Sequence, residues 1–320
     1  MGSGTAATLH AQSLSRNKGF RLEAISSRNQ VRGADLAKTF VCRHELNPRE
    51  LIADPRIEAV ILAVPPAIQP DYARQVLQRG IPLLCEKPLA PSLAAAKGLL
   101  LDGKSHPNCG INFCYRQLPE MVWLRKCLQS GVVGKPAQVR VEWILGNRLG
   151  SIPNHLPTWK REARLGGGVL MNYGIHVLDY LFFNLRNPRL EGAHGQRFSG
   201  VKSDEALAML WRTEDCSFSI QLSLISGQGP VHQMFLRGPK GSVGIRNLSP
   251  HNPAGPFRVI RDGKMHLPSI PPAGQPSMMG LFAATHQEWR RACEGKAHQL
   301  PTLTDGIYAL KLADQVLRCA

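Results

Sequence analysis

Long hydrophobic runs and secretory signals are missing from this 320-residue sequence. No stretch reaches the roughly 18 uninterrupted apolar residues of a transmembrane helix. The N-terminus has no charged segment followed by an apolar one, so no signal peptide is predicted. Hydrophobic residues still make up 43% of the chain, which is enough for a large core without disulfides. We therefore expect a cytoplasmic protein with room for two domains and no membrane partner.

Patterns for disulfides and metal binding are also lacking. The eight cysteines include no C-x-x-C pair and no Cys/His cluster with zinc-site spacing. Most lie in apolar stretches such as IPLLC (81–85) and VWLRKCL (122–128). Such positions predict reduced, mostly buried thiols and no metal site.

The charge is strongly positive but has no concentrated basic segment. Thirty-nine basic and 23 acidic side chains give a net charge of +16. Basic arms, aromatic residues interleaved with basic ones and finger motifs are all missing, so nucleic acid is not a predicted partner. A diffuse positive field favours an anionic ligand, such as a phosphorylated cofactor or an acidic sugar. The alternative is that the basic composition serves no particular ligand.

The first third of the chain alternates short apolar strands with helical patterns. Strands are predicted at 20–26, 58–66, 81–85 and 109–114, and helices at 31–40, 70–80 and 91–101. This βαβα alternation, with continuously apolar strands such as VILAV, predicts a doubly wound parallel sheet buried on both faces.

The pattern changes after Tyr115, where strands follow one another through short turns. Strands are predicted at 137–145, 204–213, 216–226, 232–238 and 241–247, with a helix before them, a Gly-Gly-Gly segment at 166–168 leading into another, and two helices at the end. We therefore expect a second α/β domain with a large, mostly antiparallel sheet. The predicted domains are residues 1–117 and 118–320.

A glycine turn opens the chain. Gly2, Gly4 and Ala7 have the G-x-G-x-x-A spacing that lets backbone approach a dinucleotide pyrophosphate at a helix N-terminus. Such a turn follows a buried β-strand, and none precedes it here. A dinucleotide-binding site is predicted, with its first strand missing.

The end of the next predicted strand indicates which dinucleotide would bind. NAD enzymes place an acid there for the ribose 2′-hydroxyl, whereas this chain has Ser26, Ser27 and Arg28. Hydroxyls and a guanidinium suit a 2′-phosphate, so a preference for NADP over NAD is predicted. The alternative is a surface arginine after an ordinary strand.

Two further segments carry candidate catalytic groups. Glu86, Lys87 and Pro88 follow a strand at its carboxyl end, where open α/β sheets bind ligands. Asn172 and His176 are four residues apart, which predicts one shared helix face and makes His176 a candidate general base. A solvated lysine and a packed structural histidine are the alternatives.

These segments resemble the Gfo/Idh/MocA family, the glucose–fructose oxidoreductase and inositol dehydrogenase group. The matching stretches are GSGTAATLH, AVILAVPP, CEKPLA, INFCYR, GVVGKPAQVRVEW, LGGGVLMNYGIHVLD, GPKGSVGI and PTLTDGIYALKLAD. The resemblance implies a Rossmann domain, a second domain with a large open sheet, an NAD(P) cofactor and assembly into a homodimer or homotetramer. It also implies a sugar or polyol as substrate.

The resemblance assigns roles to matching positions. Lys87 would hydrogen-bond the reacting hydroxyl, His176 would move its proton, and the bond between Lys87 and Pro88 would be cis. The remaining implied positions are Asn112, Pro65 and Glu86 near the cofactor, and Tyr115, Arg116, Trp159 and Asn172 near the substrate, with Asn172 also assisting catalysis. The loop at 148–160 is expected to help set specificity.

Two departures from the family pattern stand out. Many relatives have Asp where this chain has Asn172, so a protonated His176 is less favoured here. The second departure is the missing first strand, which would leave buried backbone groups unpaired at roughly 1–3 kcal/mol each. We expect that about 6–10 apolar residues belong ahead of Met1, a usual strand length. The alternative is a truncated chain that folds poorly or no longer binds cofactor.

The sequence thus predicts an NADP-preferring oxidoreductase that interconverts a hydroxyl and a ketone on a sugar, sugar derivative or cyclitol. Two alternatives stay open. One is a redox-neutral enzyme with a tightly bound cofactor, and the other is a cofactor-sensing regulatory protein without turnover.

Overall fold

The chain folds into two compact units. The computed structural model describes residues 1–103, 107–146, 159–183, 187–197, 202–225, 230–249, 252, 254–266 and 277–320. Unit 1 comprises Met1–Cys114 and Met279–Leu310, and unit 2 comprises Tyr115–Met278 and Lys311–Ala320. The first segment of unit 1 ends at Cys114, close to the predicted boundary at residue 117. Unlike in the predicted division, nearly all of α8 (Met278–Cys293) and the first part of α9 (Leu303–Cys319) belong to unit 1.

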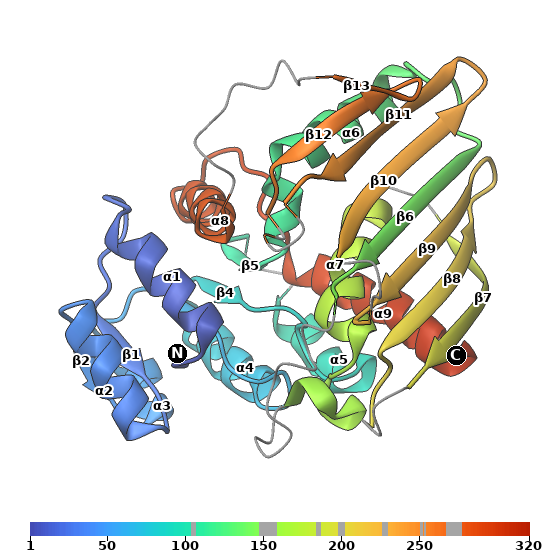
Figure 1. Ribbon diagram of the computed structural model, residues 1–320. Helices are drawn as coiled ribbons and strands as arrows, with labels where there is room; N and C mark the ends of the chain where they lie inside the picture. The colour runs from blue at the N-terminus through green and yellow to red at the C-terminus, as the bar shows by residue number, and fades with distance from the viewer. Residues whose placement is uncertain are drawn as a thin grey trace. The chain divides into compact units, whose positions relative to one another are not determined.

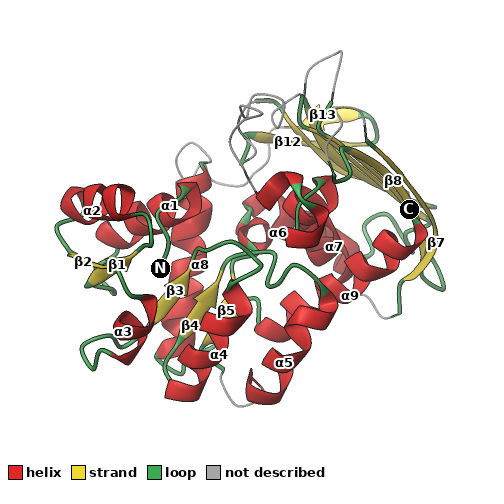
Figure 2. Cartoon of the chain, turned by 90° about the horizontal axis from the view of Figure 1, so that it is seen from below, coloured by secondary structure: helices red, strands yellow, loops and turns green. Residues whose placement is uncertain are grey.

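Unit 1 consists of short parallel strands alternating with helices (Figure 2). The strands are β1 (Ala24–Ser26), β2 (Arg43–Glu45), β3 (Val60–Leu62), β4 (Leu83–Cys85) and β5 (Cys109–Ile111). Besides α8 and α9, the helices are α1 (Thr5–Ser15), α2 (Gln30–Thr39), α3 (Pro48–Ala53), α4 (Gln69–Arg79) and α5 (Leu93–Gly103). The polar segment Arg-His-Glu of β2 and the one-and-a-half turns of α3 were not predicted, because neither has a clear apolar pattern.

The parallel strands of unit 1 lie in two separate sheets. β2 pairs with β1, and β3, β4 and β5 follow in that order in the second sheet. This is the order of a doubly wound sheet in which the position between β1 and β3 has no strand among the described residues. The chain start lies between β1 and β3 (Figure 2). A cavity of about 190 Å³ is lined by residues 19–24 on one side and 56–61 on the other.

Local signals explain where the helices of unit 1 begin and end. The Asn29 side chain accepts a hydrogen bond from the backbone N–H of Arg32 and caps α2. Gly80, with φ of 74°, ends α4 in the left-handed conformation that glycine adopts at low cost. Trp289 of α8 stacks on Phe20 at 5.2 Å between ring centroids and joins the core.

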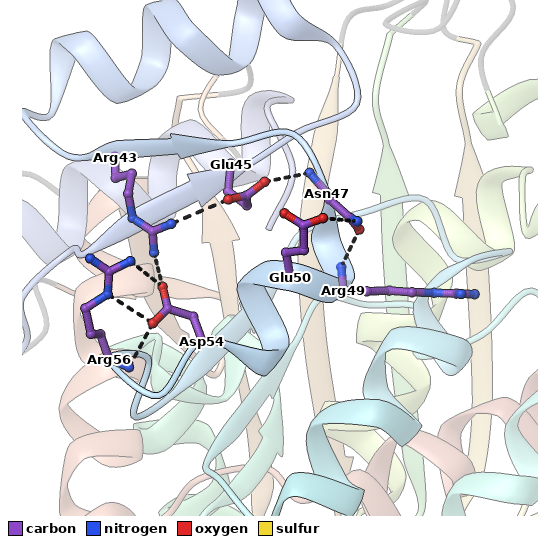
Figure 3. A network of polar contacts seen from close by, with 7 residues as sticks. All are labelled: Arg43, Glu45, Asn47, Arg49, Glu50, Asp54 and Arg56. Carbon is purple, nitrogen blue, oxygen red and sulfur yellow. Dashed lines mark hydrogen bonds and ion pairs between the residues drawn. The ribbon is translucent and has the colours of Figure 1, made fainter.

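A polar network fixes β2 to α3 at the edge of unit 1 (Figure 3). Asn47 accepts a hydrogen bond from the N–H of Arg49 at the start of α3. Asp54 pairs with Arg43 and Arg56. The hydrogen bond from Arg56 holds the pKa of Asp54 well below its usual value. This network supplies local order at the edge of the unit.

Unit 2 is built on one eight-stranded sheet in the order β13-β12-β11-β10-β6-β9-β8-β7. All neighbours are antiparallel except β6 and β9. Its strands are β6 (Gln138–Ile144), β7 (Arg189–Gln196), β8 (Ala206–Arg212), β9 (Ser217–Ser223), β10 (Val231–Gly238), β11 (Gly241–Asn247), β12 (Phe257–Arg261) and β13 (Lys264–His266). The fold thus confirms a large, mostly antiparallel sheet.

Helices α6 (Pro119–Ser130) and α7 (Ile175–Phe182) lie on one face of this sheet (Figure 1). Alternate residues of β8 are buried and exposed, as expected for a sheet with one packed face. Trp211 of β8 lies 5.2 Å from the ring of Phe182 on α7, and Phe218 of β9 lies 5.1 Å from the same ring. These aromatic contacts join α7 to the sheet.

The described residues can be compared with what the sequence predicts about thiols, membrane-spanning helices and metal sites. All eight cysteines are free; four are buried, but Cys293 and Cys319 are exposed. In the part of the chain that the structure describes, no helix is long and apolar enough to cross a bilayer. The same residues contain no cluster of His, Cys, Asp or Glu arranged to hold a metal ion.

Candidate active site

Backbone bonds to both parallel sheets hold the glycine turn in place. The N-terminal amine donates to the carbonyl oxygen of Ile61 at 2.6 Å, and the Ala63 N–H donates to that of Met1 at 2.9 Å. On the other side, Gly2 N–H donates to the carbonyl oxygen of Ser26 at 2.7 Å. Gly2 has φ of 112°, and a Cβ there would lie 2.2 Å from the Ala63 oxygen. Two residues thus bridge β1 and β3, and only glycine fits the second.

The start of α1 has the features of a pyrophosphate site. Gly4 precedes the helix, no side chain caps it, and no acidic residue occupies its first turn. A Cβ on Gly4 would meet nothing within 4 Å, so the space in front of the helix is open. Ala7 is buried at the close-packed side of the turn. Unclaimed N–H groups at a helix N-terminus suit a phosphate, so a dinucleotide fits these residues.

The residues after β1 differ in how far they are already engaged. Ser26 is buried, and its hydroxyl has no hydrogen-bond partner among the described residues. Ser27 Oγ lies 2.7 Å from Ser3 Oγ in the glycine turn. Arg28 is exposed at the carboxyl end of the strand. No carboxylate stands at these three positions to repel a 2′-phosphate.

The segment that carries Lys87 is fixed by a glutamine that the sequence did not single out. Gln69 is fully buried at the start of α4, and its Nε2 donates to the carbonyl oxygens of Glu86 at 2.6 Å, Pro88 at 3.1 Å and Leu89 at 3.1 Å. Lys87 is half-buried at the carboxyl end of β4, and the bond to Pro88 is cis, as the resemblance implies. A lone polar residue gives no sequence signal for such a role.

Glu86 is a buried, hydrogen-bonded carboxylate beside Lys87. Asn112 Nδ2 donates to Glu86 Oε1 at 2.6 Å, and the Lys87 N–H donates to Oε2 at 3.2 Å. Burial acts to raise the pKa of Glu86, but hydrogen bonds from His10 and Asn112, with the charge of Lys87, hold its pKa below its usual value. The predicted residue Pro65 lies half-buried in the turn between β3 and α4, where its carbonyl accepts from Ile68.

In unit 2, His176 belongs to an aromatic cluster. The ring of Tyr115 lies 4.8 Å from His176, 5.2 Å from Trp143 and 6.2 Å from His232, measured between centroids. His176 is buried on α7, and Tyr115 is buried beside it. The structure thus brings two predicted residues together and adds two that sequence reasoning missed, Trp143 on β6 and His232 on β10.

His232 is a neutral histidine of this aromatic cluster. It stacks on Trp143 at 4.1 Å, and neither ring nitrogen has a hydrogen-bond partner among the described residues. Burial lowers the pKa of His232 to about 3. It contributes a polar but uncharged group near Tyr115.

Asn172 lies in a π-helical turn, Leu170–Gly174, that precedes α7. Its Nδ2 donates to the carbonyl oxygen of Gly168 at 2.8 Å. The four residues from Asn172 to His176 therefore span a π turn and the start of α7 rather than one continuous α-helix, and their shared face stays a prediction. Leu170 N–H donates to Asp204 Oδ2 at 2.9 Å, which anchors the turn to the segment before β8.

Arg116 is engaged with an acid on α7. Its Nε donates to Asp179 Oδ2 at 2.8 Å, and both side chains are buried. The guanidinium also lies over the ring of Phe183 at 3.9 Å. Two charge-assisted bonds make Arg116 an anchor for Tyr115 against α7. Trp159 is half-buried in a short 3₁₀ turn, and residues 148–158 of the predicted specificity loop lie outside the described residues.

The predicted site residues fall into two groups, each described within its own unit. The glycine turn, the residues after β1 and the Lys87 segment belong to unit 1. Tyr115, Arg116, Trp159, Asn172 and His176 belong to unit 2.

Comparison with known proteins gives a consistent result for both units. Residues 1–109 match the model described as an oxidoreductase family with an NAD-binding Rossmann fold, and residues 121–244 match the GFO/IDH/MocA C-terminal domain. The chain is 24% identical to 1,5-anhydro-D-fructose reductase of Ensifer adhaerens, over 95% of this chain and 90% of that one. It is also 24% identical to inositol 2-dehydrogenase of Rubrobacter xylanophilus, over 98% and 88%.

A solved structure supports the fold. Levoglucosan dehydrogenase in complex with NADH and L-sorbose superposes with a TM-score of 0.85 at 18% identity, over 100% of this chain and 95% of that one. At this identity the likeness shows that the two proteins share a fold.

Proposed function

Because the chain belongs to the Gfo/Idh/MocA family of oxidoreductases, we propose that it is an NADP-preferring enzyme that interconverts a hydroxyl and a ketone on a sugar, sugar derivative or cyclitol. Relatives of similar length are named as a reductase of an anhydrosugar and a dehydrogenase of inositol. The observation that carries the proposal is the Lys87 segment, held at the carboxyl end of β4 by Gln69 and Glu86. Open α/β sheets bind their ligands at that edge.

The cofactor would be held by residues of unit 1. The N–H groups at the start of α1 would bind the pyrophosphate, with Gly2 and Gly4 permitting its approach. Ser26, Ser27 and Arg28 would surround the 2′-phosphate that distinguishes NADP from NAD. When bound, the nicotinamide supplies hydride transfer at its C4 atom.

The protein's own groups handle the substrate oxygen and its proton. The Lys87 ammonium hydrogen-bonds the reacting oxygen and stabilises negative charge on it. His176 accepts the hydroxyl proton during oxidation and returns it during reduction. Tyr115 orients the imidazole by ring contact at 4.8 Å, and Asn172 and Trp159 border the substrate without adding charge.

Turnover on a panel of polyols with NADP⁺, and on the matching ketones with NADPH, tests the proposal. Lys87→Ala and His176→Ala are each expected to lower kcat by about 10²-fold or more while leaving the Kd for NADPH unchanged. The matched controls are Lys97→Ala in unit 1 and His194→Ala in unit 2, both exposed and expected to keep full activity. Unchanged turnover in the Lys87 and His176 variants would overturn the assignment.

A cofactor-sensing regulatory protein without turnover is the second candidate. The divided parallel sheet and the neutral Asn172 favour it, because sensing needs binding but no proton transfer. NADPH binding with no turnover on any polyol would select this candidate. Cofactor that stays bound through purification and does not exchange would instead select a redox-neutral enzyme.

The free face of the eight-stranded sheet is the proposed contact between copies of this chain. Leu210 on β8 is 58% exposed, on the sheet face opposite to its buried sequence neighbours Met209 and Trp211. An exposed apolar side chain on this face suits an isologous interface, in which the same surface of each copy meets. Light scattering is expected to show a dimer or tetramer that Leu210→Lys dissociates.

A further inference from the structure

A chain of four buried polar side chains crosses unit 1 and ends on Glu86. Ser13 Oγ lies 2.8 Å from His286 Nδ1, His286 Nε2 lies 2.8 Å from His10 Nδ1, and His10 Nε2 lies 3.0 Å from Glu86 Oε1. Exposed fractions are 2% for Ser13, 0% for His286, 3% for His10 and 8% for Glu86. Buried polar groups of this kind are costly unless every one is bonded, and here each is.

One arrangement of protons satisfies every bond with neutral rings. Glu86 is ionised and can only accept, so His10 Nε2 carries a proton and donates to it. His10 Nδ1 then accepts from His286 Nε2–H, and His286 Nδ1 accepts from the hydroxyl of Ser13. Burial lowers the pKa of His286 to about 2, so this ring stays neutral. The chain therefore has a fixed direction that ends on the carboxylate.

Glu86 connects this series of hydrogen bonds to the backbone of Lys87. Its Oε1 accepts from both His10 and Asn112, and its Oε2 accepts from the backbone N–H of Lys87. A rotation of the carboxylate would release that N–H, and with it the backbone that carries the amine. His10 lies on α1, the helix whose N-terminus adjoins the glycine turn. The chain thus links the glycine-turn helix, α8 and the Lys87 segment.

We propose that His10 and His286 are positioning residues that hold Glu86, and through it Lys87, in the geometry that turnover requires. The inference rests on the proposed function, in which Lys87 acts on the reacting oxygen. Misplacement of a catalytic group by about 1 Å can cost on the order of 10²-fold in rate. Neither histidine touches the substrate in this scheme.

Loss of His10 has a consequence for pH that simple unfolding lacks. Among the described residues, the groups that face Glu86 are His10 from α1, Asn112 directly after β5 and, on its own segment, Lys87 and the Cys85 thiol. Without His10, one hydrogen bond fewer opposes the effect of burial on Glu86, so the pKa of Glu86 rises. The carboxyl then gains a proton as the pH falls, and its hold on the Lys87 N–H weakens.

The test compares His10→Leu with His10→Gln, whose amide N–H can still donate to Glu86. In His10→Leu, kcat is expected to fall by about 10–100-fold, with little change in KM or in the Kd for NADPH, and the acidic limb of the kcat profile is expected to move up by about one pH unit or more. His10→Gln is expected to stay within about threefold of the native enzyme with the native profile. Trp289→Phe controls for altered packing, because Trp289 lies on α8 but is not part of the hydrogen-bonded series from Ser13 to Glu86.

Two results would overturn the inference. One is a kcat and pH profile of His10→Leu that match the native enzyme. The other is an equal loss in both His10 variants with no shift of the acidic limb, which a purely structural role produces.

A measurement without substrate separates this inference from the proposed function. The carboxyl ¹³C signal of Glu86, identified by its loss in Glu86→Gln, reports the pKa of that group directly. It is expected to rise in His10→Leu and stay in place in His10→Gln. If the native protein turns over no polyol, the proposed function fails. Independently of that result, an unchanged pKa of Glu86 in His10→Leu would refute the inference that His10 holds Glu86.

Discussion

The parallel strands of unit 1 are three residues long and lie in two separate sheets, whereas the strands of unit 2 run for up to eight residues in one continuous sheet. In unit 2, backbone hydrogen bonds carry order from edge to edge. Among the described residues of unit 1, only Met1 and Gly2 join the two sheets by backbone hydrogen bonds, beside a cavity of about 190 Å³. Unit 1 therefore depends more on its helices, and we expect it to unfold first.

The largest expected effect comes from truncating the core of each unit. Trp289 in unit 1 and Trp211 in unit 2 are both 1% exposed. Replacing either with Ala is expected to cost about 3–5 kcal/mol through lost burial and the cavity left behind. Calorimetry should show two transitions, with Trp289→Ala lowering the first and Trp211→Ala the second. A single transition lowered equally by both variants would mean that the units unfold together.

The next effect concerns the gap itself. Seven apolar, β-branched residues fused ahead of Met1 are expected to pair with both β1 and β3 and to stabilise unit 1 by about 2–4 kcal/mol, at roughly 1 kcal/mol for each new backbone bond. The same extension with a central proline is the control, because proline cannot donate to the ladder. Calorimetry and the Kd for NADPH both report the result. Equal behaviour of the two extensions would show that the gap does not accept a strand.

Acid is expected to weaken both units through their buried histidines. Burial lowers the pKa of His232 in unit 2 to about 3 and that of His286 in unit 1 to about 2. Below pH 6.5 these two histidines bind protons in the unfolded state but stay neutral in the folded state. The free energy of unfolding therefore falls as the pH falls. Each group should cost about 2 kcal/mol between pH 7 and pH 5.

Single replacements separate the two contributions. His232→Phe should flatten the pH dependence of the unit 2 transition, and His286→Phe that of unit 1. Denaturant titrations from pH 5 to 8 measure both, and parallel slopes in native and variant chains would contradict the prediction.

The smallest expected effect is on cofactor choice in unit 1. Arg28→Asp should reduce the preference for NADPH over NADH by about tenfold or more, equal to about 1.4 kcal/mol, by replacing a phosphate partner with a like charge. Arg32→Asp, at an exposed residue in the first turn of α2, is the matched control. Nicotinamide fluorescence gives both dissociation constants. An unchanged ratio in Arg28→Asp would remove the basis for NADP preference.

Much of this fold was accessible from local pattern. Alternating apolar residues predicted β6, β8 and β9, and Gly80 marked the end of α4 correctly. The βαβα alternation predicted the doubly wound parallel sheet of unit 1, and the glycine turn predicted that its first strand is missing. By contrast, β2 and β7 carry little apolar signal, and their positions come from pairing with a neighbour.

The candidate site divides in the same way. Lys87 and His176 stand in distinctive motifs, so sequence alone nominated them. The partners Gln69 and His286 could not be found, because a single buried polar residue has no periodic signature and its partner can lie 276 positions away, as His10 does from His286. Arg116 was placed near the substrate, and the structure shows it paired with Asp179.

The sequence by itself determined what depends on neighbours along the chain: strand and helix segments, the glycine turn, and the residue types at the strand ends. These follow from backbone sterics and from the spacing of apolar side chains. Only the tertiary structure decided which polar groups meet in the interior and which helix belongs to which unit. Those outcomes arise because a buried donor must find an acceptor wherever the fold brings one, irrespective of distance along the chain.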